Sequence, residues 1–267
     1  AIALVSSSWQ ISTIAGPALG GILYAFGPTV VFASAFLAFA AGAVAVFSIA
    51  PRPSTHDGSP PSLARLFAGI GFIRSRPAIL GAISLDLFAV LLGGATALLP
   101  IYARDILMTG PWGLGLLRSM PAVGAAMIGL FLARRPIDRR VGPKMFAAVA
   151  VFGAATVVFG LSTSLPLSLA CLFVLGASDM VSVVIRQTLV QHETPDAMRG
   201  RVSAVNSVFI GASNELGQFE SGALAALIGP VGSVVVGGVG TLVVAALWVR
   251  LFPGLAHRDR LIEKHGE

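Results

Sequence analysis

Eight runs of about 20 mainly apolar residues follow one another in this sequence, and a run of that length can cross a lipid bilayer as a helix. The runs are continuously apolar and do not alternate with polar residues, which favours helices over a membrane β-barrel. The sequence therefore predicts an all-α membrane protein. The predicted spans are residues 3–26, 29–50, 78–102, 113–133, 145–162, 166–187, 203–228 and 230–252.

Composition supports a membrane protein and excludes several other classes. Only 11% of the residues are charged, whereas soluble domains carry about 25%. The net charge of +6 does not indicate a nucleic-acid partner, because the basic residues lie between the apolar runs. The one cysteine, Cys171, excludes an intramolecular disulfide. Neither a metal cluster of histidines nor a phosphate-binding Gly-Lys-Ser/Thr loop is present, so we expect no cofactor and no ATP hydrolysis.

The basic residues also predict the orientation of the chain. Of the 18 Lys and Arg residues, 16 lie in the connections 51–77, 134–144 and 186–202 and after residue 249. With eight spans, all four regions fall on one side of the membrane. Positive charge marks the cytoplasmic side. We therefore expect both ends of this chain in the cytoplasm and the spans in a bacterial inner membrane. We also expect membrane lipids as partners and a monomeric protein.

An internal repeat indicates how the spans are grouped. Residues 3–28 align with residues 204–230, so that Gly16 falls on Gly217 and, after one inserted residue, Gly27 falls on Gly229. Repeats of this kind are typical of transporters built from two halves. The predicted parts are the last two spans of one six-span half (1–50), a cytoplasmic linker (51–77), a complete second half (78–252) and a cytoplasmic tail (253–267). This division predicts about four further spans before residue 1.

The linker has two sections. Residues 51–62, PRPSTHDGSPPS, are rich in Pro, Gly and Ser and are typical of a flexible connection. In the following residues, 63–77, apolar side chains recur at helical spacing, which predicts a short helix lying on the cytoplasmic leaflet. The alternative is an ordinary entry into the next span.

Gly16-Pro17-Ala18-Leu19-Gly20-Gly21 is the most distinctive local motif. The spacing of Gly16 and Gly20 lets two helices approach closely, and Ser12 extends this pattern by one turn. Pro17 removes a backbone donor and loosens the preceding turn. The motif is either a hinge or a plain packing surface, and spacing alone favours neither.

This motif resembles the GxxxGPxxGG sequence on the fifth span of exporters of the major facilitator superfamily, with Ser12 in place of the first Gly. The resemblance implies antiport. Residues 134–144 resemble the superfamily's cytoplasmic GxxxDRxGRR loop, although no Gly lies four residues before Asp138 and Gly142 falls one residue late. The residues carried over from this loop motif are Asp138, Arg139, Gly142 and Lys144. The phrases ALLPIYARDIL and TPDAMRGRVSAVNSVFIGASNELG are most similar to the enterobactin-exporter-like branch, also called transmembrane secretion effectors. That branch implies a twelve-span fold, of which this chain holds the fifth to the twelfth span.

Four charges inside the predicted spans are candidates for function, because a charged group is expensive at that depth. At 1.5 Å per helical residue, Asp86 lies about 15 Å and Asp179 about 10 Å from the cytoplasmic edge. Arg118 and Glu220 lie roughly 24–28 Å from that edge, in the outer part of the membrane. A carboxylate in an apolar setting is biased toward its neutral form. Asp86 and Asp179 are therefore the candidates for proton exchange.

Helical rotation at 100° per residue refines this assignment. Asn206 and Glu220 fall in one sector of their span, and Asp179 and Arg186 share a face of theirs. We therefore predict Arg118, Glu220, Arg186 and Asn206 as cavity or gate residues, with Arg118 and Glu220 forming an outer ion pair. A pairing of Asp179 with Arg186 through water is the plainer alternative.

Together these features predict a secondary transporter, not an enzyme, that exports a small amphipathic molecule such as a siderophore or drug by proton antiport. The rival hypotheses are a non-transporting sensor or scaffold and a membrane-embedded enzyme. They differ in one observable respect. A transporter should bring Asp86, Arg118, Asp179 and Glu220 to a central cavity.

Overall fold

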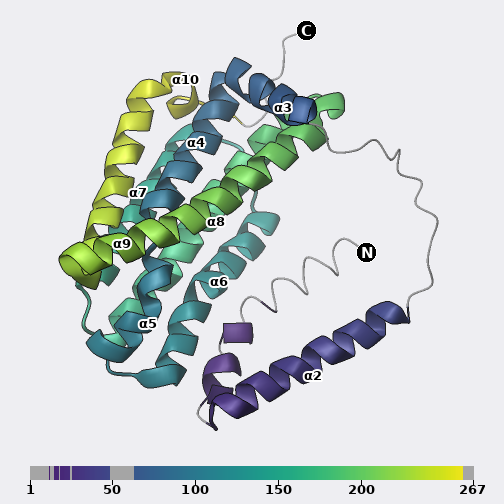
Figure 1. Ribbon diagram of the computed structural model, residues 1–267. Coiled ribbons are helices and arrows are strands. Elements are labelled where there is room, and N and C mark those ends of the chain that lie inside the picture. Colours follow the sequence, from purple (N-terminus) through teal and green to yellow (C-terminus); the bar gives the residue numbers. More distant parts are fainter. Residues whose placement is uncertain (1–11, 13–14, 18, 25, 49–62, 261–267) are drawn as a thin grey trace.

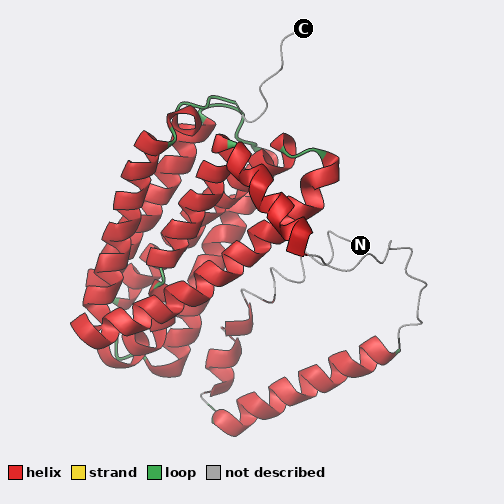
Figure 2. Ribbon diagram, turned by 45° about the horizontal axis from the view of Figure 1, so that its top comes forward, coloured by secondary structure: helices red, strands yellow, loops and turns green. Residues whose placement is uncertain are grey.

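The computed structural model describes residues 12, 15–17, 19–24, 26–48 and 63–260 (Figure 1). Every regular element in these residues is helical (Figure 2). Six of the helices are long and apolar enough to cross a membrane. The elements are α2 (Pro28–Phe47), α3 (Leu63–Ser75), α4 (Pro77–Leu92), η1 (Ala95–Leu98), α5 (Leu99–Ile101), η2 (Tyr102–Ile106), α6 (Gly110–Arg134), α7 (Val141–Leu161), α8 (Leu165–Glu193), α9 (Asp196–Leu251) and α10 (Pro253–Ala256).

Proline and glycine set most of the helix boundaries. Pro lies in the first turn of α2, α4, α6, α8 and α10, where its missing N–H would have had no helical partner. Gly229 interrupts α9 with φ 80° and ψ 162°, a backbone conformation that is essentially restricted to glycine. Pro230 follows directly. Gly229 therefore divides α9 into a first arm (196–228) and a second arm (230–251), which fold back on each other (Figure 1).

Helices α4, α6, α7, α8 and α9 form one bundle, and small residues lie at its closest contacts. A Cβ placed on Gly176 of α8 would collide with the carbonyl oxygen of Pro121 on α6. Gly153 of α7 and Gly238 of α9 face each other in the same way. Without a hydrophobic driving force in lipid, such close backbone approach is how membrane helices gain contact. The small residues of the sequence thus explain the tight bundle.

The predicted span 78–102 is one continuous path in the structure but not one continuous helix. Helix α4 ends at Leu92, and the path continues through η1, α5 and the π-helical η2 to Ile106. A Cβ on Gly94 would lie within 2.6 Å of the Gly217 carbonyl oxygen, so the break lets α9 approach. Beyond the break, Tyr102 is fully buried, stacks on Phe159 at 4.6 Å between ring centroids and donates a hydrogen bond of 2.8 Å to the Gly160 carbonyl. These contacts fix the irregular stretch against α7.

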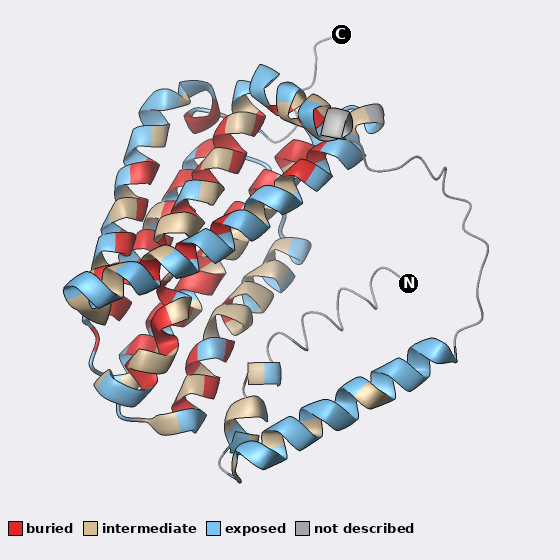
Figure 3. Ribbon diagram, viewed as in Figure 1, coloured by how far each residue is buried: buried red, intermediate tan, exposed pale blue. Residues whose placement is uncertain are grey.

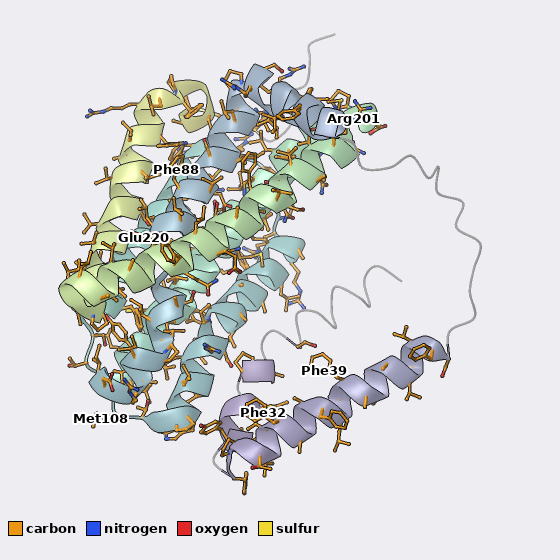
Figure 4. The ribbon with its side chains drawn as sticks, in the orientation of Figure 1. Phe32, Phe39, Phe88, Met108, Arg201 and Glu220 are labelled. Atoms are coloured by element: carbon orange, nitrogen blue, oxygen red, sulfur yellow. The ribbon has the colours of Figure 1, made fainter. Side chains whose placement is uncertain are left out.

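Helix α2 differs from the bundle because none of its residues is buried (Figure 3). It stands apart from the other helices, and large side chains on it such as Phe32 and Phe39 are exposed (Figure 4). Phe39 is 80% exposed. The apolar surface of α2 has the composition of a surface that faces lipid or further helices.

Helix α3 forms within the stretch predicted to be a short helix, and it packs on the start of α9. A Cβ on Gly69 would meet the side chain of Val205 and the carbonyl of Arg201, which lies at the start of α9 in Figure 4. Ile73 is buried with Val202 and Val205. Its position on a membrane leaflet stays a prediction. Residues 51–62 of the predicted linker and 261–267 of the predicted tail lie outside the described residues.

Most predicted spans match helices closely, but the spans 166–187 and 203–228 are shorter than the helices that contain them. The predicted span 166–187 corresponds to α8, which continues to Glu193. Only Thr194 and Pro195 separate α8 from α9. Most residues of the predicted connection 186–202 therefore belong to the two neighbouring helices, and their place outside the membrane stays a prediction. Arg186 consequently lies two turns inside a helix.

Candidate functional site

Three of the predicted site residues form one buried network in the bundle. Arg186 of α8 pairs with Asp86 of α4, with 3.0 Å between Nη2 and Oδ2. Its Nη1 donates a hydrogen bond of 3.2 Å to Oδ1 of Asn206 on the first arm of α9. The side chains of Arg186 and Asp86 are only 4% and 8% exposed. The network therefore ties three helices together through one guanidinium.

The pairing of Arg186 with Asp86 follows from the length of α8. Because the helix runs on to Glu193, Arg186 projects from within it toward the neighbouring helix α4. Hydrophobic residues such as Leu85, Ile185 and Leu189 surround this region. A charge so enclosed needs a counter-charge, which Asp86 supplies. The nitrogen Nε of Arg186 stays buried without a hydrogen-bond partner.

Asp179 lies on the same helix as Arg186, next to this network. It lines a small cavity together with Asp86, Ser178 and Ser182. The cavity measures 10 Å³, about the smallest space that can hold one water molecule. In the described residues Asp179 forms no ion pair, and the direct partner of Arg186 is Asp86. The face of α8 that carries Asp179, Ser182 and Arg186 is thus directed toward Asp86 of α4.

A larger cavity of 350 Å³ opens beside Asp179, between the α4–η1 break, α6, α8 and the first arm of α9. Its volume is within the range of small-molecule sites, which is about 300–1,000 Å³. Its walls combine apolar and small residues with a few polar groups. The lining residues are Val90, Gly93, Gly94, Thr96, Arg118, Pro121, Ala122, Ala125, Phe152, Leu175, Gly176, Asp179, Asn214 and Gln218.

Arg118 lines this cavity, whereas Glu220 does not. Arg118 is exposed, and in the part of the chain that the structure describes it lies in no ion pair with Glu220. Glu220 lies on the first arm of α9 (Figure 4), and its Oε2 is buried without a hydrogen-bond partner. The outer ion pair between these two residues stays a prediction.

The face of α9 that the rotation argument assigned to the cavity packs mainly against α4. Ser213, Gly217 and Ser221 on that face are buried, and a Cβ on Gly217 would lie 2.7 Å from the Leu91 carbonyl oxygen. The amides that line the cavity are those of the neighbouring residues Asn214 and Gln218. The sequence shows both residues as polar groups within a predicted span. It does not show which face of the helix packs on a neighbouring helix and which face lines a cavity.

The glycine-proline motif near the start of the chain faces a second cavity. Pro17, Gly20 and Gly21 line a space of 540 Å³ opposite Pro111, Gly115 and Arg118 of α6. A Cβ on Gly21 would lie 2.8 Å from the Pro111 carbonyl oxygen, so this glycine permits a close helix contact. Ser12 is exposed, and Gly16 and Gly20 have open space around them. The motif thus has one packing position at Gly21, and its role as a hinge stays a prediction.

The loop motif at residues 134–144 contacts the end of the chain through its backbone. The amide of Gly142 donates a hydrogen bond of 2.9 Å to the Arg258 carbonyl, and the amide of Arg140 donates one of 3.1 Å to the Asp259 carboxylate. Arg258 also pairs with Glu193 at the end of α8. Asp138, Arg139 and Lys144 are exposed, and none forms an ion pair within the described ranges.

The site as a whole is an apolar pocket that carries a cation and a carboxylate at different levels. Of the four charges that the sequence places inside predicted spans, Arg118 and Asp179 line the larger cavity and Asp86 lines the small cavity beside it. Such a pocket can bind a molecule with an apolar body and polar ends. Among the described residues no group of His, Cys, Asp and Glu could hold a metal ion.

Comparison with known proteins gives a consistent picture. A family profile described as the Major Facilitator Superfamily matches residues 1–218. The chain is 28% identical over 254 residues to the enterobactin exporter EntS of Citrobacter koseri, covering 94% of this chain and 60% of that protein. It is 26% identical over 251 residues to EntS of Escherichia coli strain K12, covering 93% of this chain and 60% of the relative. The chain therefore spans about 60% of the length of these curated relatives.

Proposed function

Since the chain belongs to the Major Facilitator Superfamily, we propose that it is part of a secondary transporter that exports a small amphipathic molecule, such as a siderophore or a drug. Family membership indicates a multi-pass membrane transporter rather than an enzyme. The observation that carries the proposal is the 350 Å³ cavity, which places Arg118 and Asp179 in otherwise apolar walls between packed helices. The direction of export is supported by the relatives, which are named exporters.

The proposed architecture is that of eight spans, the fifth to the twelfth of a twelve-span protein. Residues 1–50 would close the first half and residues 78–252 would form the second. The division of α9 at Gly229 supports this count, because it makes two span-length arms of one helix. The proposed orientation places the ends of the bundle that carry the connection 134–144 and residues 250–260 in the cytoplasm, as the positive charge there favours.

Proton antiport is the proposed energy source, with Asp86 or Asp179 as the exchanging group. Asp179 borders both cavities, so a proton could reach it from the larger one. Asp86 is held by Arg186, and loss of that pair would free it. In both cases the two halves would rock around the cavity to give access from alternate sides. A monomer in contact with lipid is sufficient for this cycle.

The proposal is tested with the gene product as the cell makes it, in inverted membrane vesicles with an imposed pH gradient. A panel of siderophores and drugs should contain at least one compound that accumulates only when the protein and the gradient are both present. Asp179→Asn and Asp86→Asn are then compared with Asp105→Asn, a carboxylate that is exposed and paired with Arg104. Full gradient-driven transport in both test variants would rule out coupling by these residues, and no gradient-dependent movement of any compound would argue against export itself.

A further inference from the structure

Arg118 and its surroundings carry an inference about the kind of molecule that the cavity accepts. We propose that the cavity selects amphipathic anions, and that Arg118 holds their negatively charged group. This inference rests on the proposed export function, because it specifies the substrate class of the same cavity. It concerns binding, however, and can be tested without transport.

The first argument is that Arg118 has no counter-charge among the residues that the structure describes. A guanidinium within a membrane span needs a partner or a water-filled cavity. Within the described ranges Arg118 forms no ion pair. The first two predicted spans cannot supply one, because the earliest acidic residue of the sequence is Asp57. The acid closest to the cavity along α4, Asp86, is already paired with Arg186.

The second argument is the position of the other charge. Gly176 lies against the backbone of Pro121, and Gly129 lies near the side chain of Met180, so α6 and α8 run in the same direction. Arg118 lies three residues before Pro121 and Asp179 lies three residues beyond Gly176, which corresponds to roughly 9 Å between them along the helices. Within the described ranges Asp179 forms no ion pair with Arg118. An ionised Asp179 would instead repel an anion and direct it toward the Arg118 end.

The third argument is the composition of the walls. Val90, Phe152 and Leu175 offer an apolar surface for the body of a ligand. Asn214 and Gln218 are exposed amides on the opposite wall and can donate hydrogen bonds to an anionic group. A guanidinium binds carboxylate, sulfonate or phosphate groups through paired N–H donors. The cavity thus joins an apolar surface to an anion-binding end.

The competing assignment for Arg118 is an ion pair with Glu220. In the structure Glu220 does not line the cavity, and its Oε2 is buried without a hydrogen-bond partner. If the pair forms during the transport cycle, Arg118 would be neutralised by the protein and would not distinguish ligand charges. The two assignments therefore predict different binding preferences.

The test uses two fluorescent probes that share an aromatic body and differ in charge. Anilinonaphthalene sulfonate is an anion, and phenylnaphthylamine lacks the sulfonate. Binding of each to the purified protein in detergent is measured by fluorescence titration. Arg118→Gln should weaken binding of the sulfonate by about tenfold or more, because a charge-assisted hydrogen bond is lost. Binding of phenylnaphthylamine should stay within about twofold, which also shows that the variant is folded.

Two further variants complete the test. Arg118→Lys keeps the positive charge and should retain most of the sulfonate affinity. Arg134→Gln removes an exposed arginine from the last turn of the same helix and should change neither affinity. Equal loss of both probes, or no loss of the sulfonate in Arg118→Gln, would overturn the inference and leave the export proposal standing. Conversely, charge-selective binding without transport of any compound would support the inference about the cavity and count against export.

Discussion

Arg186 and Arg118 are both arginines on apolar helices of one bundle, yet their surroundings are opposite. Arg186 is buried, pairs with Asp86 and donates to Asn206. Arg118 is exposed in a cavity and has no acidic partner among the described residues. A buried and paired charge holds helices together, whereas an exposed and unpaired charge is available to a ligand. The contrast separates the structural part of this site from the part that is open to binding.

The largest expected effect is on the paired arginine. Arg186→Met leaves Asp86 buried without its counter-charge and should lower the free energy of unfolding by about 3–5 kcal/mol. Thermal unfolding of the purified protein in detergent, followed by tryptophan fluorescence, measures this loss. Arg118→Met is the matched control, and its stability should stay within about 0.5 kcal/mol of the native protein.

The double variant Asp86→Leu/Arg186→Met provides the second arm of that experiment. Removing both charges leaves no unpaired ion in the bundle and should recover most of the lost stability. If the Arg186→Met variant unfolded at the same temperature as the native protein, the distinction between the two arginines would be wrong.

A smaller effect is expected at the third member of the network. Asn206→Leu leaves Nη1 of Arg186 without its acceptor and should cost about 1–3 kcal/mol of stability. Asn214→Leu makes the same change on the same arm of α9, where the side chain is exposed in the cavity and bonds to no buried cation. It should leave the unfolding temperature unchanged. Equal unfolding temperatures for the two variants would show that Asn206 does not support Arg186.

The smallest effects are expected at the ends of the bundle. Arg258→Gln removes a partly exposed pair with Glu193 and should cost about 1 kcal/mol, less at high salt because solvent ions screen the pair. Arg104→Gln removes the exposed pair with Asp105 and should have no measurable effect at any salt concentration. Unfolding temperatures at low and high salt check both variants. A loss for Arg258→Gln as large as that for Arg186→Met would break the proposed relation between burial and effect.

The sequence predicted the helices well because length and hydropathy determine them. Gly229 and Pro230 marked the division of α9, and the apolar spacing after residue 62 predicted the helix that became α3. The break after Leu92 could not be predicted, since it depends on the approach of Gly217 and Ser221 to Gly94.

The site was predicted less completely than the fold. Depth along each span singled out Asp86, Asp179 and Arg118, and in the structure these residues line cavities, whereas their functional roles stay predictions. The partner of Arg186 was missed because the end of α8 was placed too early, in a connection. The positions of Asn214 and Gln218 in the cavity wall were not predicted. The face that α9 turns toward the cavity depends on the helix against which α9 packs, and that tertiary contact cannot be read from one sequence. The charge of a residue and its depth along a span can be read from the sequence nearby, whereas the direction in which its side chain points depends on the neighbouring helices.

The single-residue turn at Gly229 has a consequence for the biosynthesis of the protein. With one residue between the arms of α9, no loop is available that could stay in water while the second arm waits to enter the bilayer. Backbone outside a helix is not tolerated when it faces lipid. If both arms are membrane spans, as proposed, they would enter the membrane together as a helical hairpin. A residue with a Cβ at position 229 would strain this turn by about 1–3 kcal/mol and so weaken the hairpin.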